Sequence, residues 1–339
     1  MITQAPLRIA RGGTIARITL VLLLIAAGAL SALPWLSGVG GSGRAVALLV
    51  YILLAVMWNA LAGFAGLVSI GQTLFFGVAA YVTIRLADAG VDPYLAILVA
   101  IVAGAALGWV TSLFMLSLSG GEFAIGMWVL SSLAHLCVNL DPLIQGETGT
   151  SLIALNAYDI ETRTALTLWL ALGVTLAILA ALIALLRSST GAAITAIRDD
   201  EIGARSIGVD VMRTKRIVFI LAATGTAAAG ALWLASNTTF QPRAYFGVQW
   251  TAYMLFMVLV GGLGRIEGAL IGAVLFFMIE TFFGAYGAWY LVGLGAVAVV
   301  FALFLPRGLW GWISPYLPGE AIPTGYLITE NTQKPREES

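Results

Sequence analysis

The stretch 165-ALTLWLALGVTLAILAALIALLR-187 carries no charge before its closing arginine. A helix needs about 20 mostly apolar residues to cross the hydrocarbon core of a bilayer. The stretch is therefore predicted to be a membrane-spanning helix, and similar runs recur along the chain, about ten in all. The predicted spans are 15–36, 44–62, 67–86, 94–117, 122–140, 165–187, 217–235, 247–263, 266–285 and 288–306.

The composition of the whole chain agrees with these spans. Of 339 residues, 17 are Lys or Arg and 17 are Asp or Glu, while 60% are hydrophobic and the mean hydropathy is +0.98. A soluble domain is about one quarter charged, because large exposed apolar patches are unfavourable in water. The composition excludes a soluble enzyme, a disordered chain and a nucleic-acid-binding protein. It predicts an all-α polytopic membrane protein.

The positions of Lys and Arg predict the orientation, since cytoplasmic loops carry an excess of basic residues. With the N-terminus inside, ten spans place 13 basic residues on the inner side and leave four outside. The four are Arg44, Arg85, Arg163 and Arg243. Both termini are then cytoplasmic. The basic start of the chain resembles that of a signal peptide, but the apolar run after Arg17 is too long for one, so a retained first helix is expected.

Two polar segments interrupt a single permease domain that we assign to residues 1–315. The outer loop is predicted at 141–164 and the inner loop at 188–216, and residues 316–339 are expected to form a polar cytoplasmic tail. The inner loop, with Arg187 at its edge, holds ten of the chain's charges. The single cysteine, Cys137, excludes an intrachain disulfide and a cysteine-based metal cluster.

The inner loop has the pattern of a helix pair. Ser189 or Thr190 is predicted to cap a first helix that runs from Gly191 to Ile207. Gly208 then stands where a helix commonly ends on glycine, because glycine adopts the left-handed conformation at little cost. The first helix is predicted to present one apolar face, formed by Ala193, Ile194, Ile197, Ala204 and Ile207.

The second helix of the pair is predicted to start after Asp210, whose carboxylate caps it, and to lead into the next span. Glu201 and Arg205 are four residues apart and are expected to form an ion pair across one helical turn. This fixed, two-faced shape favours docking of a cytoplasmic partner, and an ordinary solvated loop is the alternative. The predicted docking residues are Arg198, Asp199, Asp200, Glu201, Arg205 and Gly208.

Two glycine-rich regions, 60–72 and 258–272, are candidates for broken or re-entrant helices. A broken helix frees backbone groups, which are tolerated at membrane depth only around a cavity or inside protein. The polar residues of the first region therefore become candidates for the substrate pathway, and tight packing through small residues is the alternative. These candidates are Asn59, Gly66, Ser69 and Gln72.

Several strings resemble one family. The inner-loop string 196-AIRDDEIGARSIG-208 resembles the cytoplasmic signature of LivM-type permeases, which are subunits of bacterial ABC importers for branched-chain amino acids. Further strings that resemble the family are 63-GFAGLVSIGQ-72 with 75-FFG-77, 257-MVLVGGLG-264, 268-GALIGA-273 and 305-LPRGL-309. The resemblance runs from about residue 45 to 312, and it is looser over 117–151.

The resemblance implies a permease that works by alternating access in the bacterial inner membrane. It further implies four kinds of contact: two cytoplasmic ABC ATPases, a second related permease, a periplasmic or lipid-anchored substrate-binding protein, and membrane lipid. The inner loop would be the coupling loop that faces the ATPases. The implied substrates are branched-chain amino acids, while urea and short amides remain open because related permeases are associated with them.

The chain itself carries no ATPase motif. Its only lysines are Lys215 and Lys334, and neither follows a Gly-x-x-x-x-Gly pattern. We therefore expect a transport subunit that is not an enzyme, that has no catalytic residue, and that binds no metal or cofactor of its own. ATP would be used by the partner subunits.

An ion-coupled secondary transporter of a small polar solute is the alternative from another class. Such carriers use ionisable groups at membrane depth, and only His135 and Glu280 lie clearly inside the predicted spans. His135 is expected to be hydrogen-bonded between helices. Glu280, near the outer end of its span, is a candidate for contact with the pathway or for snorkelling outward. This shortage of charge disfavours a carrier, and it leaves little material for a membrane enzyme.

Overall fold

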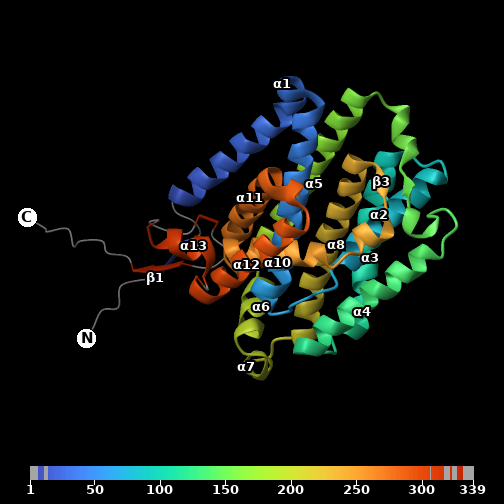
Figure 1. The fold of residues 1–339 in the computed structure, drawn as a ribbon. Helices are drawn as coiled ribbons and strands as arrows, with labels where there is room; N and C mark the ends of the chain where they lie inside the picture. The colour runs from blue at the N-terminus through green and yellow to red at the C-terminus, as the bar shows by residue number, and fades with distance from the viewer. Residues whose placement is uncertain (1–6, 11–13, 306, 317–320, 323–326, 331–339) are drawn as a thin grey trace, which may run out of the picture.

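The computed structural model describes residues 7–10, 14–305, 307–316, 321–322 and 327–330. Helices make up most of this part of the chain (Figure 1). The long helices are α1 (Thr14–Asn59), α2 (Thr73–Asp88), α3 (Pro93–Met115), α4 (Gly120–Asn139), α5 (Ile160–Leu186), α8 (Val211–Asn237), α10 (Gln249–Gly261), α11 (Ile266–Phe283) and α12 (Ala288–Phe304). The shorter ones are the π-helix η1 (Ala60–Phe64), α6 (Ser189–Asp199), α7 (Glu201–Ser206), α9 (Pro242–Tyr245) and α13 (Gly308–Ile313). The 3-10 turns are η2 (Gly146–Thr148), η3 (Ile153–Ala157), η4 (Gly284–Tyr286) and η5 (Ser314–Tyr316).

Eight helices in the described residues are long and apolar enough to cross a membrane. The first of these runs from Ile15 to Phe64, and it contains two of the predicted spans because α1 reverses at Gly38, whose φ is 61°. Figure 1 shows the N-terminal half of α1 at the edge of the bundle and the second half turning back into it. The ten predicted runs fall on helices, while the number of crossings and the side of each terminus stay predictions.

The centre of the bundle is α8, which packs against α1, α2, α3 and α5. Small residues allow a close approach to α3. A Cβ added at Gly104 would overlap the Ala227 methyl group, and one added at Gly108 would lie 2.6 Å from the Ala223 methyl group. In a membrane, this close packing of backbones supplies the van der Waals contact that holds helices together.

The first glycine-rich region is a broken helix. After α1, the chain forms the π-helix η1 and then an irregular segment, residues 66–72, before α2 begins at Thr73. We call residues 66–72 the helix break. The span predicted at 67–86 therefore starts several residues too early, since the break occupies its first part.

The second glycine-rich region, 258–272, is a tight turn between two complete helices. Helix α10 ends at Gly261 and α11 begins at Ile266. Gly262 and Gly264 have φ values of 134° and 76°, which side chains rarely allow. This region therefore connects α10 to α11 without a re-entrant segment.

Two short strand pairs join distant parts of the chain. Strand β2 (Thr150–Ser151) pairs antiparallel with β3 (Thr239–Phe240). Strand β1 (Leu7–Ala10) pairs antiparallel with β4 (Leu327–Glu330), so these two strands, far apart in the sequence, lie side by side (Figure 1). Of the predicted tail 316–339, residues 317–320, 323–326 and 331–339 lie outside the described residues, as does the basic residue Arg11.

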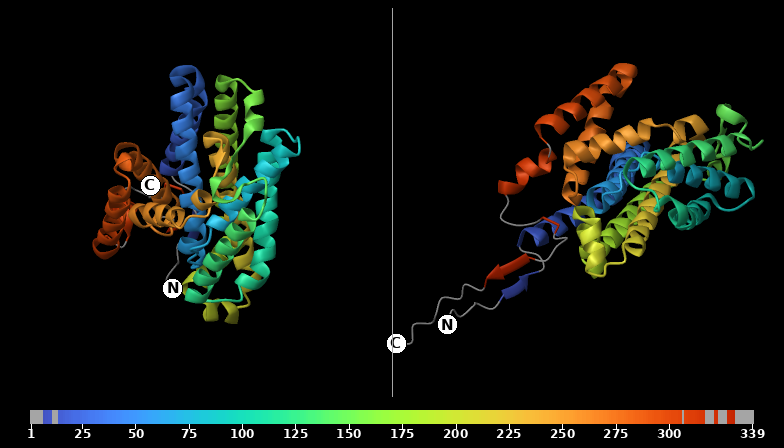
Figure 2. Two further views of the ribbon diagram at one scale, coloured as in Figure 1. Left: turned by 45° about the vertical axis from the view of Figure 1, so that its right-hand side comes forward. Right: turned by 90° about the horizontal axis from the view of Figure 1, so that it is seen from below.

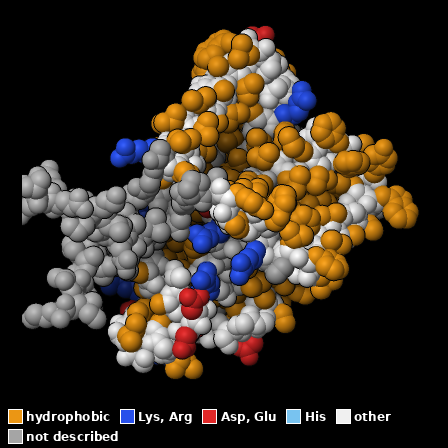
Figure 3. Space-filling model, turned by 90° about the vertical axis from the view of Figure 1, so that its left-hand side faces the viewer, with side chains coloured by type: hydrophobic (Ala, Val, Ile, Leu, Met, Phe, Trp, Pro, Cys, Tyr) orange, Lys and Arg blue, Asp and Glu red, His pale blue; other side chains and the backbone are white. Residues whose placement is uncertain are grey.

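The surface is mostly apolar, with its charges gathered in places. In Figure 2, α11 and α12 lie along one edge of the bundle, and α12 exposes most of its side chains. Figure 3 shows basic side chains in the centre of one face with acidic side chains below them, while apolar side chains cover much of the rest. This distribution is typical of a protein whose apolar sides face lipid.

Candidate functional site

The inner loop folds into two short helices, and its apolar face packs on the bundle. Ile194, Ile197 and Ala204 are almost fully buried, and α6 contacts α5 and α8. The prediction of one continuous helix from Gly191 to Ile207 is wrong, because α6 ends at Asp199 and α7 starts at Glu201.

Asp200 causes this division. Its backbone is extended, and its Oδ1 atom accepts hydrogen bonds of 3.0 Å from the N–H groups of Ile202 and Gly203. Aspartate competes with the helix in this way, because its side chain satisfies the backbone donors that begin a new helix. The predicted cap at Ser189 or Thr190 is also wrong. Helix α6 begins after Ser188, whose side chain makes no cap.

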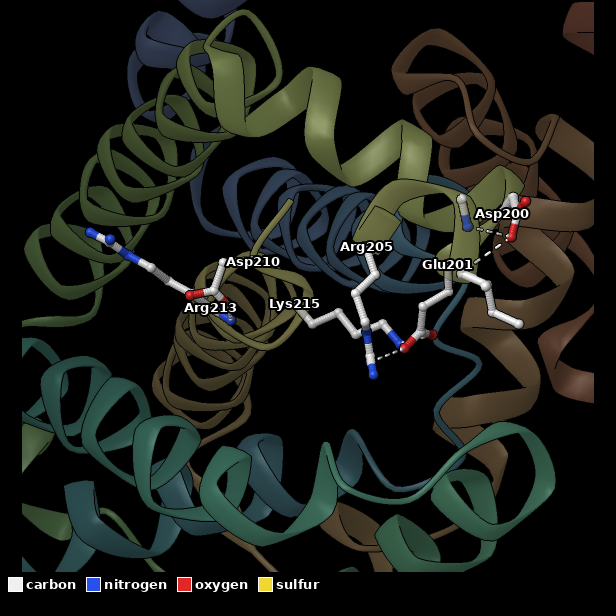
Figure 4. Close-up of polar contacts among 8 residues, drawn as sticks. Asp200, Glu201, Arg205, Asp210, Arg213 and Lys215 are labelled. Atoms are coloured by element: carbon white, nitrogen blue, oxygen red, sulfur yellow. Dashed lines mark hydrogen bonds and ion pairs between the residues drawn. The ribbon is translucent and has the colours of Figure 1, made fainter. Parts of the chain in front are cut away.

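The other predicted features of the loop are confirmed. Gly208 ends α7 with a φ of 89°. Asp210 caps α8, and its Oδ1 atom accepts a 3.0 Å hydrogen bond from the N–H of Arg213. Glu201 and Arg205 form the predicted ion pair, with 3.3 Å between Oε1 and Nη2 (Figure 4).

A second cation also binds Glu201. The Nζ atom of Lys215, on α8, lies 2.6 Å from the other carboxylate oxygen of Glu201 (Figure 4). The Lys215 side chain is only 14% exposed, so this contact fastens α7 to the start of a central helix. No local pattern predicts this contact, because Lys215 follows Glu201 by 14 residues and lies on a different helix.

The tip of the loop exposes apolar side chains. Ile202 is 83% exposed and Ile207 is 76% exposed. Ile207 was predicted on one apolar face with Ile194, Ile197 and Ala204, but those three are buried and Ile207 is exposed, because α7 is a separate helix after Asp200. An isoleucine at position 202, among charged neighbours, was a signal in the sequence that we did not use.

Arg198 and Asn59 lie where the inner loop meets the bundle. Arg198 donates from Nη1 to the carbonyl of Gly63, in the π-helix, over 3.1 Å. The same guanidinium binds the carboxylate of Asp199 at 2.8 Å. Asn59 bonds to the α10–α11 turn through both its polar atoms. Nδ2 donates to the carbonyl of Arg265 at 2.9 Å, and Oδ1 accepts from the N–H of Gly264 at 2.8 Å.

The helix break has its backbone groups satisfied by neighbouring side chains. Trp58 donates from Nε1 to the carbonyl of Ser69 at 2.9 Å, and the hydroxyl of Thr251 donates to the carbonyl of Ile70 at 2.7 Å. The side chains of Ser69 and Gln72, in contrast to these backbone carbonyls, have no hydrogen-bond partners in the described part of the chain. Both residues are fully buried, and their Oγ, Nε2 and Oε1 atoms have no hydrogen-bond partner among the described residues.

The five predicted pathway residues therefore do not form one group. Asn59 and Gly66 lie beside the inner loop, because a Cβ at Gly66 would lie 3.5 Å from the Cγ atom of Arg198. Ser69 and Gln72 lie further along the break. Glu280 is half-buried beside Tyr51, about 20 Å along α11 from the end that contacts Asn59, at 1.5 Å per residue.

Two polar clusters hold the outer segments together. Glu147 contacts Nε2 of His135 at 2.8 Å, and it accepts hydrogen bonds from Nδ2 of Asn139 at 2.6 Å and the N–H of Arg243 at 3.1 Å. Burial raises the pKa of Glu147, but the hydrogen bond from Asn139 and the nearby His135 outweigh it, and the pKa is lowered overall. His135 thus pairs with a loop, rather than between helices as expected.

The second cluster is centred on Asp141. It accepts a 2.6 Å hydrogen bond from the hydroxyl of Tyr81 and forms a 2.8 Å ion pair with Nε of Arg85. The hydrogen bond from Tyr81 is the main cause that lowers the pKa of Asp141, with smaller contributions from Leu143 and Arg85. Together with the β2–β3 pair, these contacts give the outer segments 141–159 and 238–248 a fixed shape.

Long apolar helices around a broken helix, with one polar loop at their end, are the architecture of a multi-pass helical membrane protein. A family model described as "Branched-chain amino acid transport system / permease component" matches residues 42–305. The chain belongs to this family of permease components, as its strings led us to expect.

Curated relatives carry the same description. The high-affinity branched-chain amino acid transport system permease protein LivM of Escherichia coli K12 is 25% identical over 328 residues, which cover 89% of this chain and 76% of the relative. Its Salmonella typhimurium counterpart is 25% identical over 311 residues, covering 84% and 73%. A solved structure described as "An inward-facing conformation of a putative metal-chelate type ABC transporter" aligns with 90% of this chain and 99% of its own, at a TM-score of 0.48 and 16% identity.

Proposed function

We propose that this chain is the transmembrane permease subunit of an ABC importer for branched-chain amino acids, meaning leucine, isoleucine and valine. Its place would be the bacterial inner membrane, where it would work by alternating access. The family and the two relatives support the transport class, since both relatives are described as branched-chain amino acid permeases. Urea or a short amide is the competing substrate class within the same mechanism.

The geometry of the inner loop carries the proposal. The loop pairs Glu201 with Arg205 and Lys215, so it keeps its shape. It also exposes Ile202 and Ile207, whose burial against a partner would be favourable. A rigid loop with an apolar tip is suited to receive the movement of a cytoplasmic ATPase. The loop would pass this movement to α8 as rigid-body motion of packed helices.

The proposed importer would contain further subunits besides this permease. Two ATPase subunits would bind and hydrolyse ATP, and this chain would bind no cofactor or metal itself. A second related permease would complete the pathway, and membrane lipid would surround the pair. The outer segments 141–159 and 238–248 would meet a periplasmic or lipid-anchored substrate-binding protein, because their polar clusters give them a fixed shape.

Ser69 and Gln72 are the strongest candidates for contact with substrate in this proposal. Burial of unpartnered polar atoms costs about 1–3 kcal/mol for each group, and such atoms are rare in folded proteins. A zwitterionic or polar solute that passes the helix break would supply the missing partners. Gly66 and Glu280 remain further candidates along the pathway.

The proposal is tested by reconstitution of the complete importer into proteoliposomes with the binding protein outside and ATP inside. Uptake of labelled leucine, isoleucine and valine that requires ATP would support it. Uptake that ignores ATP and collapses with the ion gradient would contradict it in favour of a secondary carrier. Competition by excess urea or acetamide, without competition by leucine, would contradict the substrate assignment alone.

The docking surface has its own test. Ile202→Ser is expected to reduce the amount of ATPase that co-purifies with the permease by about tenfold, as truncation of a central interface side chain commonly does. Ile153→Ser is the matched control, because Ile153 is 71% exposed but lies on an outer segment. Equal ATPase recovery with both variants would contradict docking at the tip of α7.

A further inference from the structure

The buried amide of Asn59 ties the end of α1 to the turn between α10 and α11. Asn59 is the last residue of α1 before the π-helix, and it is fully buried. Its Nδ2 and Oδ1 atoms bind the carbonyl of Arg265 and the N–H of Gly264, both in the turn between α10 and α11. Because each polar atom of the side chain already has a partner in this turn, Asn59 is placed to hold the turn against the end of α1.

The same place is in contact with the inner loop. Arg198, at the end of α6, donates to the carbonyl of Gly63, which lies one turn beyond Asn59. Gly63 also touches the α10–α11 turn, since a Cβ there would lie 2.5 Å from the nitrogen of Gly264. Asp199 binds Nε and Nη2 of Arg198, which leaves Nη1 directed at Gly63.

Four residues therefore form a continuous chain of contacts: Arg198, Gly63, Asn59 and Gly264. We propose that this chain is a relay that moves the helix break and the α10–α11 turn together when the inner loop is displaced. Arg198 and Asn59 are then positioning residues for transport. In this proposal Arg198 acts on the π-helix, through the hydrogen bond from Nη1 to Gly63, rather than on the ATPase. Asn59 acts on the α10–α11 turn rather than on substrate. The inference rests on the proposed function, because it assigns a path to the movement that the ATPases start.

The relay differs from ordinary helix packing in what it connects. Close packing through glycine would hold the π-helix against the turn without any polar contact. Here each hydrogen bond ends on a backbone group in η1 or in the α10–α11 turn. A displacement of α6 would therefore act on the π-helix and on the α10–α11 turn, and helices bend sharply where a π-helical segment interrupts their hydrogen bonds.

The test uses the complete importer in proteoliposomes and measures ATP hydrolysed per amino acid taken up. Asn59→Asp keeps the size of the side chain but places a carboxylate oxygen against the carbonyl of Arg265. Arg198→Lys keeps the charge but loses the planar fork that spans Asp199 and Gly63. Each variant is expected to raise the ratio by about fivefold or more, the lower range of coupling between sites.

Matched controls make the same chemical changes elsewhere. Asn237→Asp alters an exposed asparagine whose amide also donates to a carbonyl, that of Trp233. Arg213→Lys alters an exposed arginine in the first turn of α8. Neither control is expected to change the ratio. The double variant of Asn59 and Arg198 should raise the ratio no further than the stronger single variant, since residues of one relay are not additive.

The outcomes separate the relay from the proposed function. If wild-type importer shows no ATP-dependent uptake, the proposed function fails. If wild type is coupled and both variants lose uptake and hydrolysis in equal proportion, the ratio is unchanged and the relay is contradicted. Additive effects in the double variant would also contradict it. Where Asn59→Asp yields no assembled complex, Arg198→Lys alone decides the result, because its side chain lies at the surface of the bundle.

Discussion

The inner loop and the helix break differ in whether their polar side chains have hydrogen-bond or ion-pair partners. In the inner loop, Asp200 caps α7 and Glu201 binds two cations. In the break, Ser69 and Gln72 are buried with polar atoms that lack partners among the described residues. Satisfied polar groups hold one conformation, while unsatisfied ones raise the energy of the conformation that contains them. The difference supports the proposed roles, in which the loop transmits movement and the break contacts a solute.

The largest expected effect is a loss of stability caused by a substitution in the helix break. A Cβ at Gly71 would overlap the carbonyl of Met127 on α4, so Gly71→Ala is expected to prevent the break from packing. Overpacking costs about 1–3 kcal/mol or more, and the melting temperature of the purified permease should fall by several degrees. Gly173→Ala is the control, because a Cβ at Gly173 meets no atom within 4 Å. Equal melting temperatures would show that the break tolerates a shift of α4.

The next largest effect is expected when the contact that fastens the inner loop to α8 is removed. Lys215→Met deletes the ion pair with Glu201, and a hydrogen bond to a charged group contributes about 1.5–3 kcal/mol. We expect uptake to fall by about tenfold, while binding of the amino acid to the substrate-binding protein stays unchanged. Lys215→Arg should restore part of the uptake. Full uptake by Lys215→Met would contradict the claim that transport requires the inner loop to be held by this ion pair.

Gln72→Leu tests the unpartnered side chains of the helix break. Its effects on stability and on uptake should be opposite in sign. Replacing a buried unpartnered amide by an apolar side chain of similar size removes a penalty of about 1–3 kcal/mol. The melting temperature should rise while uptake falls. Thr73→Val is the contrast, since the Thr73 hydroxyl is paired with Ser131 at 2.8 Å and its loss should lower the melting temperature. A fall in stability for Gln72→Leu would contradict the absence of a partner.

Asp200→Ala tests the cap that separates α6 from α7. Loss of a capping side chain costs about 0.5–2 kcal/mol, and it removes the reason for the chain to turn at this position. Amides of α7 should exchange hydrogen several times faster in hydrogen-exchange mass spectrometry. Asp200→Asn should retain slow exchange, because asparagine also caps helices. Fast exchange in both variants would indicate that the negative charge, rather than the cap, holds α7.

The smallest effect concerns pH at the outer clusters, which are paired like the inner loop. The pKa of Glu147 is lowered in the folded protein, so its ionised form stabilises the fold above the unfolded pKa of about 4.3. This contribution is lost as the pH falls through the lower folded pKa. The difference in melting temperature between wild type and Glu147→Gln should be largest above about pH 5 and shrink toward pH 3. A difference that does not change with pH would contradict the role of the charge.

Local signals in the sequence predicted much of the inner loop. Gly208 and Asp210 were identified as a helix stop and a helix cap because each acts on backbone groups within a few residues. The break within 60–72 was a candidate from its glycines, and the structure confirms it. The continuous helix from 191 to 207 was wrong, because the side chain of Asp200 competes with the helix in a way that spacing alone does not reveal.

The contacts that carry the proposals connect residues far apart in the chain. Lys215 reaches Glu201 from another helix. Asn59 and Arg198 bind groups more than a hundred residues away, in the α10–α11 turn and the π-helix. Asn59 was placed in the pathway because a polar residue beside glycines was its only visible feature. The two hydrogen bonds to the α10–α11 turn support the positioning role that we propose for it instead.

By itself, the sequence determined the class of this protein, because apolar runs of membrane length and scarce charge leave no other stable environment for it. The sequence also determined which segments stay polar, but it left 60–72 and 258–272 as two candidates for a broken helix, and the structure interrupts the first. The tertiary structure decided which polar groups are paired and which are left without a partner. Hydrogen bonds depend on distances of about 3 Å between atoms, and only the packed bundle brings Asn59, Arg198 and the α10–α11 turn within that distance of one another.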